Sequence, residues 1–381
     1  MTPQRAIYLD HNATAPVLPD VAAAVAGALS LGGNPSSVHR FGRAARQAVD
    51  RARAAVAALV GAPAGWVVFT SGGTEANNLA LASAPALKDV AADRVLVSAI
   101  EHDSVLRAVP DAIRVKVGGD GVVDLAALDA LLAQGKGGRA LVSLMLANNE
   151  TGVIQPIAQA AVIAHRHGAT LHCDAVQAAG RVAIDMNALG ADLLTLSAHK
   201  LGGPTGVGAL IVRDGVDLTP MLSGGGQESW RRAGTENVAG IAGFGVAAEA
   251  GQQGLARMAE IAALRDEIER GIRDIAPQAP IYGSRAPRLA NTSCIGMPGV
   301  KGETQVMAFD LAGIAVSAGA ACSSGKVAPS AVLGAMGAGE TQAAEAVRVS
   351  LGRGNTREHA TRFVAEWKAL YDRTRRLKAA A

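Results

Sequence analysis

The chain has 381 residues, more than one compact core usually contains, so two domains are expected. Its 36 basic side chains outnumber the 33 acidic ones by only three, and this near balance argues against a nucleic-acid or membrane partner. No stretch reaches the ~18 consecutive apolar residues that a transmembrane helix needs, and no apolar leader precedes the first expected strand, so we expect a cytoplasmic protein. Three cysteines, an odd number, do not form a disulfide framework, which agrees with a reducing compartment.

Apolar, strand-like runs alternate with alanine-rich helical segments from Val56 to Val212. This alternation predicts a largely parallel sheet with helices on both faces, and therefore an α/β fold. The strands are expected near residues 66–70, 94–98, 113–117, 140–146, 169–173, 192–196 and 207–212.

The second half of the chain has a different pattern. A periodically apolar stretch over about residues 237–275 predicts a long helix that leaves the large domain. Short strands and helices follow in an α+β manner, and the chain closes with a charged helix from about Arg357 to Lys378. We place the boundary near residue 255, so that residues 12–255 form the large domain and residues 1–11 and 256–381 form the small one.

A lysine follows one of the expected strands. The apolar run 191–196 leads through Ser197 and His199 to Lys200, and a glycine-rich stretch, residues 201–208, comes next. Strand ends are the usual places for chemistry in α/β proteins. A lysine amine there acts as a Schiff-base nucleophile when burial or a neighbouring positive charge keeps part of it neutral. On its own, the pattern also fits a solvated loop lysine followed by a turn.

An acid and an amide follow the preceding expected strand. Asp174 comes directly after the run 169–173, and Gln177 lies three residues further on. Pyridoxal phosphate needs an acid or an arginine at its pyridine nitrogen, and a carboxylate there keeps the ring protonated as an electron sink. Asp174 is the candidate for that role, and Gln177 is the candidate for a hydrogen bond to the ring hydroxyl. The alternative is that Asp174 caps the next helix.

A glycine turn after the strand 66–70 offers a phosphate site. Gly72 and Gly73 separate this strand from an alanine-rich helix that begins at about Thr74. A helix N-terminus with small residues presents free N–H groups and a partial positive charge to a phosphate. Thr74 and Glu75 also suit ordinary helix capping. Three such loops, with phosphate donors, a ring acid and a lysine, together predict a pyridoxal-phosphate site.

Eight motifs extend this pattern along the chain: SGGTE, IEHDSV, ANNETG, HCDAVQ, SAHKLGGPTGVG, RRAGTEN, SAGAACSSG and SLGRGNT. With these motifs, in this order, the chain resembles the cysteine desulfurases of the NifS and IscS kind, which belong to the class V aminotransferase family of fold-type I pyridoxal-phosphate enzymes. The resemblance runs from Tyr8 to about Arg353. It implies a homodimer with a mainly parallel seven-stranded sheet, helices on both faces of that sheet, and a smaller α+β domain.

The resemblance also implies roles for single residues. His102 stacks on the cofactor ring and moves protons, and Asn149 lies near the ring hydroxyl and the substrate. Arg353 binds the substrate carboxylate with the assistance of Asn34, although Asn34 before a proline also fits a simple turn. The remaining cofactor ligands, all at the phosphate, are Gly73, Thr74, Ser197, His199 and Thr235, the last reaching the phosphate of the neighbouring subunit.

The segment 317–326 carries a cysteine among alanine, serine and glycine. Such a segment suits a flexible loop better than a packed core, and the thiolate of Cys322 could then reach a bound substrate. A buried structural cysteine is the alternative, and the resemblance favours the catalytic role. Cys294 alternates with apolar residues and is expected on a strand, whereas Cys173 is expected on the strand face opposite Asp174.

The reaction that the resemblance implies converts L-cysteine into L-alanine. Lys200 holds the cofactor and takes the substrate α-proton, Asp174 keeps the ring nitrogen protonated, and Cys322 attacks the substrate sulfur and keeps it as a persulfide. A sulfur-acceptor protein, such as an iron–sulfur scaffold, then receives the sulfur for clusters or other thio-cofactors. A selenocysteine lyase or a class V aminotransferase would share this scaffold, and a catalytically silent sulfur-transfer scaffold is a further alternative. No metal ligands are predicted.

Overall fold

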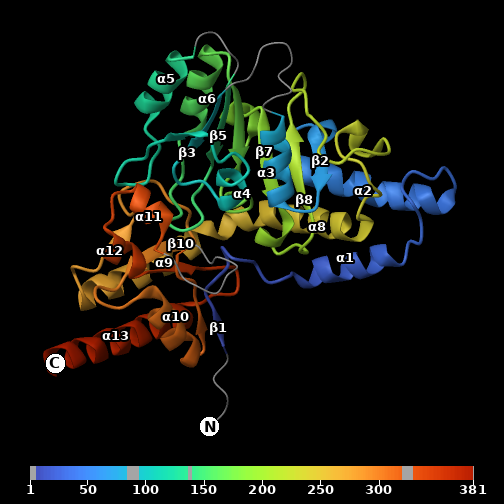
Figure 1. The fold of residues 1–381 in the computed structure, drawn as a ribbon. Coiled ribbons are helices and arrows are strands. Elements are labelled where there is room, and N and C mark those ends of the chain that lie inside the picture. The colour runs from blue at the N-terminus through green and yellow to red at the C-terminus, as the bar shows by residue number, and fades with distance from the viewer. Residues whose placement is uncertain (1–5, 84–93, 136–139, 320–328, 381) are drawn as a thin grey trace.

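A seven-stranded sheet forms the centre of the larger part of the molecule (Figure 1). The computed structural model describes residues 6–83, 94–135, 140–319 and 329–380. The strands of this sheet are β2 (Val67–Thr70), β3 (Arg94–Ser98), β4 (Ile113–Val115), β5 (Ala140–Met145), β6 (Thr170–Asp174), β7 (Leu193–Ser197) and β8 (Gly208–Val212). Each lies within a residue or two of its predicted position, so the predicted α/β fold is confirmed.

The order of the strands across the sheet is β2-β8-β7-β6-β5-β3-β4. From β7 to β4 all neighbours are parallel. Strand β8 is antiparallel to both β7 and β2, so β2 points in the same direction as β7. The carboxyl ends of β2, β3, β5, β6 and β7 therefore meet at one edge of the sheet, which is where α/β proteins bind ligands.

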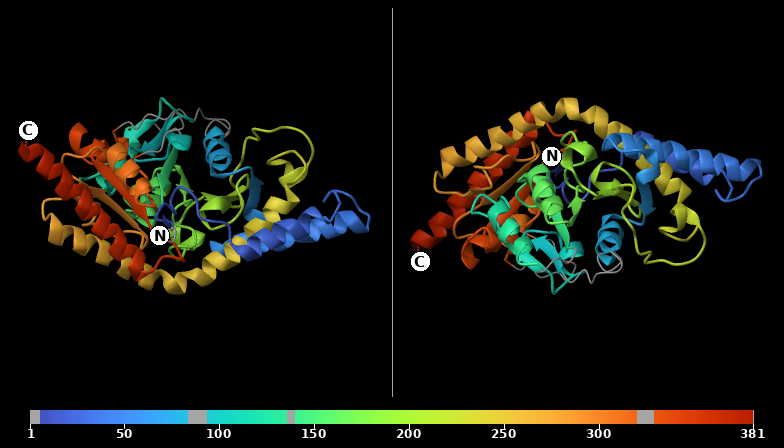
Figure 2. Two further views of the ribbon diagram at one scale, coloured as in Figure 1. Left: turned by 90° about the horizontal axis from the view of Figure 1, so that it is seen from below. Right: turned by 90° about the horizontal axis from the view of Figure 1, so that it is seen from above.

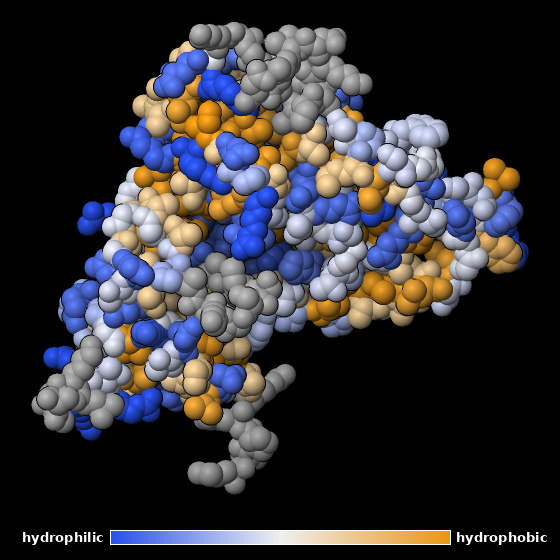
Figure 3. Space-filling view, in the orientation of Figure 1, coloured by the Kyte–Doolittle hydropathy of each residue, from blue (hydrophilic) through white to orange (hydrophobic). Residues whose placement is uncertain are grey.

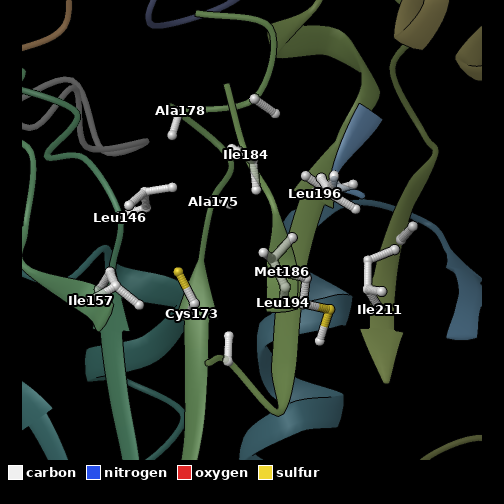
Figure 4. Packing of buried hydrophobic residues seen from close by; sticks show 14 of the residues in the cluster. Leu146, Ile157, Cys173, Ala175, Ala178, Ile184, Met186, Leu194, Leu196 and Ile211 are labelled. Atoms are coloured by element: carbon white, nitrogen blue, oxygen red, sulfur yellow. The ribbon is translucent and has the colours of Figure 1, made fainter. Parts of the chain in front are cut away.

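Helices cover both faces of this sheet. They are α1 (Pro19–Leu29), α2 (Arg40–Leu59), α3 (Gly73–Ala82), α4 (Asp103–Leu106), α5 (Leu125–Ala133), α6 (Ile157–Arg166), α7 (Met186–Leu189) and α8 (Val238–Gly254), with the 3-10 turns η1 (Ala64–Trp66), η2 (Ala198–Lys200) and η3 (Gln227–Trp230). Successive strand side chains point to opposite faces. One face, with Phe69, packs against α2, α5, α6 and α8, and the other, with Val68, packs against α3 and α4. Figure 4 shows Cys173 within the first cluster, so it lies on the strand face opposite Asp174, as predicted.

The long helix predicted over 237–275 is present as α8, the turn η4 (Leu255–Arg257) and α9 (Met258–Ile275). Figure 2 shows it running along the molecule from the sheet to a second part. That part contains β1 (Ile7–Tyr8), β9 (Ile281–Tyr282), β10 (Thr292–Gly296), α10 (Gly302–Leu311), β11 (Ile314–Ala315), α11 (Ala331–Ala335), α12 (Glu340–Ala344), β12 (Ala346–Ser350) and α13 (Arg357–Ala380). The predicted C-terminal helix and the strand position of Cys294 are confirmed by α13 and β10.

A separate hydrophobic cluster holds this second part together. It gathers side chains of α9, α10 and α13 around the fully buried Trp367. Ile7 and Leu9 join it, because β1 pairs in parallel with β11 and brings the start of the chain to this side. The turn η4 coincides with the boundary placed near residue 255, and the division of the chain into two domains stays a prediction.

Helices α1 and α2 form a hairpin that projects from the sheet, at the right of Figure 1. Figure 3 shows hydrophobic surface along α1, where Leu29 is 72% exposed. Val38 and Phe41, in and next to the loop that joins the two helices, are also exposed. Among the described residues, no helix combines the length and the apolar composition that crossing a bilayer would require.

Candidate active site

The carboxyl edge of the sheet holds a cavity of about 200 Å³. Asp174 ends β6, Ser197 ends β7 just before Lys200 in η2, and Gly73 opens α3 after β2. Of the predicted cofactor ligands, the cavity is lined by Gly73, Thr74, His102, Asn149, Asp174, Gln177, Ser197, His199 and Lys200. These residues come from five separate loops, and the shared direction of their strands is what brings them together.

Asp174 is buried in the wall of this cavity, with 6% of its surface exposed. Its Oδ1 accepts a hydrogen bond of 2.9 Å from the backbone N–H of Val176, and its Oδ2 accepts one of 2.7 Å from the amide of Asn77. Asn77 also donates to the hydroxyl of Ser104 at 2.8 Å, while its own Oδ1 is buried without a partner. Two donors therefore fix the carboxylate.

Sequence reasoning missed Asn77. The available signal was its position on α3, four residues after Gly73, because residues four apart share one face of a helix. The face of α3 that begins at the glycine turn therefore continues along the cavity, and Asn77 places its amide against Asp174.

Lys200 points its amine at the backbone of the N-terminal segment. Its Nζ donates to the carbonyl oxygens of Asn12 and Ala13, at 2.6 and 2.7 Å. Burial lowers the pKa of Lys200 to about 7, and the positive charges of Arg348 and Arg181 act in the same direction. A lysine whose pKa lies near neutrality is suited to act as a nucleophile, and its burial differs from the solvated loop lysine of the alternative interpretation.

The glycine turn at the start of α3 is closely packed. A Cβ at Gly73 would lie 3.0 Å from Cγ2 of Val176 and 3.3 Å from Cβ of Ser197, so a side chain here would fill the space beside the turn. Thr74 does not cap the helix: Gly72 occupies the capping position and Thr74 is exposed at the cavity. The start of a ten-residue helix, next to a serine hydroxyl, is an arrangement suited to a phosphate.

Two histidines flank the cavity in different ways. His199 lies at the same end as Ser197, and burial lowers its pKa to about 4, so that it is neutral at pH 7. His102 caps α4: its Nδ1 accepts from the backbone N–H of Ser104 at 3.1 Å and lies 2.8 Å from the Ser104 hydroxyl. Capping fixes the ring of His102, and its side chain lines the cavity.

Three predicted residues do not line this cavity. The guanidinium of Arg353 donates to the carbonyl of Ala250 in α8, and Arg353 lines a second cavity of about 420 Å³ that Lys200 also borders. Asn34 lies in the loop between α1 and α2, where its Oδ1 accepts from the N–H of Ser36 at 2.8 Å, which is the turn that the alternative interpretation described. Thr235 is exposed outside the cofactor cavity of its own chain.

Arg348 is a second residue near the site that sequence reasoning missed. It is 5% exposed, donates to the carbonyl of Asn149 at 3.0 Å and forms an ion pair of 2.8 Å with Asp10. Its Nε is buried without a partner among the described atoms. Among the side-chain charges that act on the pKa of Lys200, Arg348 has the largest effect. It lies five residues before Arg353, inside β12 rather than beyond its end.

Cys322 lies outside the described residues, but both flanks of its segment are described. Ser317 donates to Oδ2 of Asp10 at 2.8 Å, and the other oxygen of Asp10 pairs with Arg348. Ser330 donates to Oε2 of Glu150 at 2.6 Å, and Glu150 is the residue that follows Asn149. Both anchors therefore sit beside the cofactor cavity.

Cys173 and Cys294 are both buried, and burial raises the pKa of each thiol. Neither therefore supplies a thiolate at neutral pH, because the charged form is disfavoured without water. Only one further cysteine exists in the sequence, at position 322.

The family model described as aminotransferase class-V matches residues 7–363. The chain belongs to this family. A curated cysteine desulfurase of Cereibacter sphaeroides is 44% identical over 385 residues, which cover 97% of each protein. Among solved structures, a NifS-like protein from Rickettsia africae ESF-5 is 37% identical with a TM-score of 0.89, over 97% of this chain and 100% of that one. The structure of SspA in complex with cysteine is 29% identical with a TM-score of 0.76, over 91% and 98%.

Enzymes of this family use pyridoxal phosphate, which is therefore the cofactor of this protein. The cavity fits that group. A buried carboxylate with two donors suits the pyridine nitrogen, the buried and unpartnered Oδ1 of Asn77 leaves an acceptor beside it, and the cradle at Gly73 suits the phosphate. The amine of Lys200 suits the cofactor aldehyde.

Proposed function

We propose that the protein is a cysteine desulfurase, which converts L-cysteine into L-alanine and passes the sulfur to Cys322. The observation that carries the proposal is the anchoring of Ser317 and Ser330 beside the cofactor cavity. Cys322 follows Ser317 by five residues, and five residues span at most about 17 Å. The proposal requires the thiol of Cys322 to meet a substrate at Lys200 within that length of chain. The curated desulfurase and the cysteine-bound SspA structure support this choice.

Lys200 and Asp174 serve the step at the substrate α-carbon. When bound, pyridoxal phosphate supplies an electron sink next to that carbon. Asp174, held by Val176 and Asn77, keeps the ring nitrogen protonated. Lys200 takes the α-proton, which an amine with a pKa of about 7 accepts readily at neutral pH. His102, which lines the cavity, would shuttle protons, and Gly73, Thr74, Ser197 and His199 would hold the cofactor phosphate.

The sulfur step is a transfer between two thiols. The Cys322 thiolate bonds to the substrate sulfur as the bond from that sulfur to the substrate β-carbon breaks. The electron pair of the broken bond stays with the substrate, which is reprotonated at that carbon and leaves as L-alanine. The products are alanine and a Cys322 persulfide, so the step needs no external oxidant or reductant. A sulfur-acceptor protein, such as an iron–sulfur scaffold, then takes the outer sulfur.

Two arginines are candidates for the substrate carboxylate. Arg353 was predicted from its motif and borders, with Lys200, the cavity of about 420 Å³, whereas Arg348 lines neither cavity and has its guanidinium bound to Asn149 and Asp10. We propose Arg353, because it is the arginine that shares a cavity with the reactive lysine. Arg353→Lys should then raise KM for L-cysteine by roughly 10-fold, since a bidentate donor is lost. An unchanged KM in Arg353→Lys, together with a raised KM in Arg348→Lys, would move the role to Arg348.

We further propose a homodimer in the cytoplasm, with Thr235 at the partner's cofactor phosphate. The exposed apolar side chains of Leu29, Val38, Phe41 and Trp230 support a protein-covered surface at the α1–α2 hairpin and η3. Asn34 lies in the loop between α1 and α2. Its predicted assistance in binding the substrate carboxylate would therefore be given to the site of the partner subunit, across the same interface. Sedimentation velocity tests the dimer, and a Thr235→Ala variant that binds the cofactor as tightly as the parent would remove Thr235 from the phosphate site.

Intact-protein mass spectrometry after a single turnover with L-cysteine tests the activity. We expect one added sulfur, mapped to Cys322, together with stoichiometric alanine. Cys322→Ala should lose both while retaining the cofactor, and Cys294→Ala is the matched control, because its thiol is buried and should be dispensable. Alanine formation at the parent rate by Cys322→Ala would overturn the assignment. Turnover only with an amino acceptor, or only with selenocysteine, would favour the aminotransferase or the selenocysteine lyase.

A further inference from the structure

A buried arginine without an acidic partner lies behind the reactive lysine. Arg181, in the turn after β6, is 8% exposed. Its Nη1 donates to the backbone oxygen and to Oε1 of Gln177, at 2.8 and 2.5 Å, and its Nη2 donates to the carbonyl of His11 at 3.1 Å. All of these acceptors are neutral, and no carboxylate in the described part of the chain pairs with it.

Such a charge is costly to bury. Burial and the like charge of Arg348 lower the pKa of Arg181 to about 10, so it is still a cation at pH 7. An isolated cation in a low-dielectric interior is strongly disfavoured unless its donors are satisfied. Here both terminal nitrogens of Arg181 donate to neutral oxygens, which leaves the positive charge uncompensated. Its field therefore acts on the neighbouring groups.

The contacts of Arg181 converge on the groups that hold the lysine amine. Gln177 uses its Oε1 for Arg181 and donates its Nε2 to the carbonyl of Asn12 at 3.0 Å, and that same carbonyl accepts from Nζ of Lys200 at 2.6 Å. Arg181 also holds the carbonyl of His11, one residue earlier. A guanidinium can only donate, so it fixes which end of the Gln177 amide faces it and leaves the NH₂ end toward Asn12 and the cofactor cavity.

We propose that Arg181 is a positioning residue that keeps the free Lys200 amine neutral and in place, through its uncompensated charge and through the Gln177–Asn12 network. The inference rests on the proposed role of Lys200 and is independent of Cys322. Without the charge of Arg181, a larger fraction of the Lys200 amine would be protonated. Without the planar guanidinium group, Gln177 and residues 11–13 would lose the side chain that binds both of them.

The positive charge of Arg181 shifts the pKa values of three surrounding groups in the same direction. Arg181 lowers the pKa of Lys200, of His199 and of His11, in each case in addition to burial. The other side-chain charges that act on Lys200 are Arg348, which lowers its pKa, and Asp10 and Asp174, which raise it. Asp10 is paired with Arg348 and Asp174 is held by Asn77, so Arg181 is the cation whose charge no acid offsets.

The reactivity of Lys200 in the full-length protein freed of cofactor tests this directly. The probe is trace acetic anhydride, which acetylates only neutral amines, and the rate at Lys200 is followed by peptide mass spectrometry from pH 5.5 to 9. For the parent the rate should rise with a midpoint of about 7. Arg181→Gln removes a like charge, so a midpoint higher by roughly one pH unit is expected, which lowers the rate at pH 7 by about fivefold.

Two further variants separate charge from geometry. Arg181→Lys keeps the positive charge but lacks the planar guanidinium group. The pH midpoint of Lys200 acetylation should therefore stay within about 0.3 pH units of the parent, while the affinity for the cofactor falls. Arg213→Gln is the matched control: Arg213 also donates to backbone carbonyls, of Ala191 and Met186, but on the far side of the sheet core. Its loss should leave the midpoint unchanged.

The holoenzyme gives a second measure. In the reconstituted enzyme, the pH midpoint of the visible absorption of the bound cofactor should rise in Arg181→Gln and stay in Arg181→Lys. An unchanged acetylation midpoint in Arg181→Gln overturns the proposal, as does an equal rise in Arg213→Gln, which would mark a general effect. If Arg181→Gln does not fold, a raised midpoint in Arg181→Lys overturns the charge effect instead. A wrong assignment of Cys322 would change none of these values.

Discussion

Replacing Glu101 by glutamine should stabilise the protein at alkaline pH. Glu101 is 3% exposed, and its Oε1 accepts from the hydroxyl of Ser98 at 2.6 Å and from the N–H of Met145 at 2.8 Å, while its Oε2 is buried without a partner. Burial raises the pKa of Glu101 from 4.5 to about 8; the two hydrogen bonds oppose this, and the Asp174 carboxylate adds to it. Glutamine keeps an acceptor for both donors and cannot ionise.

The direction follows from proton binding in the two states. Below pH 4.5 folded and unfolded chains both hold the proton of Glu101. Between pH 4.5 and about 8 the unfolded chain releases it and the folded chain keeps it, so the free energy of unfolding falls as the pH rises, and it levels off above about 8. At about 1.4 kcal/mol per pKa unit, the full loss is roughly 5 kcal/mol, and water penetration reduces it toward a few kcal/mol.

Urea unfolding of the parent and of Glu101→Gln at pH 5 and at pH 8.5, followed by circular dichroism, measures the effect. We expect nearly equal stability at pH 5 and a variant that is more stable by about 2–5 kcal/mol at pH 8.5. Glu269→Gln is the control: it breaks the buried ion pair with Arg288, so it should destabilise at both pH values. A difference between parent and Glu101→Gln that does not change with pH would refute the reasoning.

Two further predictions concern packing and the cofactor. Asn77→Ala removes a donor from the Asp174 carboxylate, so cofactor affinity should fall roughly 10-fold in a spectroscopic titration; unchanged affinity would show that Val176 alone fixes the acid. Gly245→Ala in α8 places a Cβ 2.7 Å from Cα of Ala52 in α2 and should cost about 1–3 kcal/mol in urea unfolding. Gly27→Ala in α1 meets open space and should stabilise by about 0.5–1 kcal/mol, and similar effects of the two glycine changes would contradict the packing argument.

Much of the fold was predictable because most strands of the large sheet, such as β2, β5, β7 and β8, are buried on both faces and read as short apolar runs. Val67 to Thr70 and Leu193 to Ser197 stand out for this reason, and the residues that follow them, Gly73 and Lys200, carry the chemistry. The order of the strands was not predictable. Strand β8 lies between β7 and β2 and is antiparallel to both, so β2 runs in the same direction as β7. This arrangement depends on the pairing of β2 with β8, which are more than a hundred residues apart in the sequence.

Arg348 shows what motif reading leaves out. Arg353 stands in a motif of the resembling family, whereas Arg348 reads as one polar residue in an apolar strand. The structure ends β12 at Ser350, so that Arg353 lies beyond the strand and turns to α8, while Arg348 stays in the strand and meets Asn149. The register of a strand decides which side chain faces the site, and register follows from pairing with β10.

Backbone atoms supply the part of the site that sequence cannot signal at all. The carbonyl groups of His11, Asn12 and Ala13 receive the donors of Arg181, Gln177 and Lys200. Every residue has a backbone carbonyl group, so no sequence pattern identifies the carbonyl groups that take part in the site. With the Lys200 amine protonated, the cations gathered there, Arg181, Arg348 and Lys200, would exceed the nearby carboxylates, Asp10 and Asp174, by one. Loss of the amine proton removes that excess, which together with burial favours the neutral amine, and a cofactor that brings a phosphate and a ring oxygen adds negative charge to the same group.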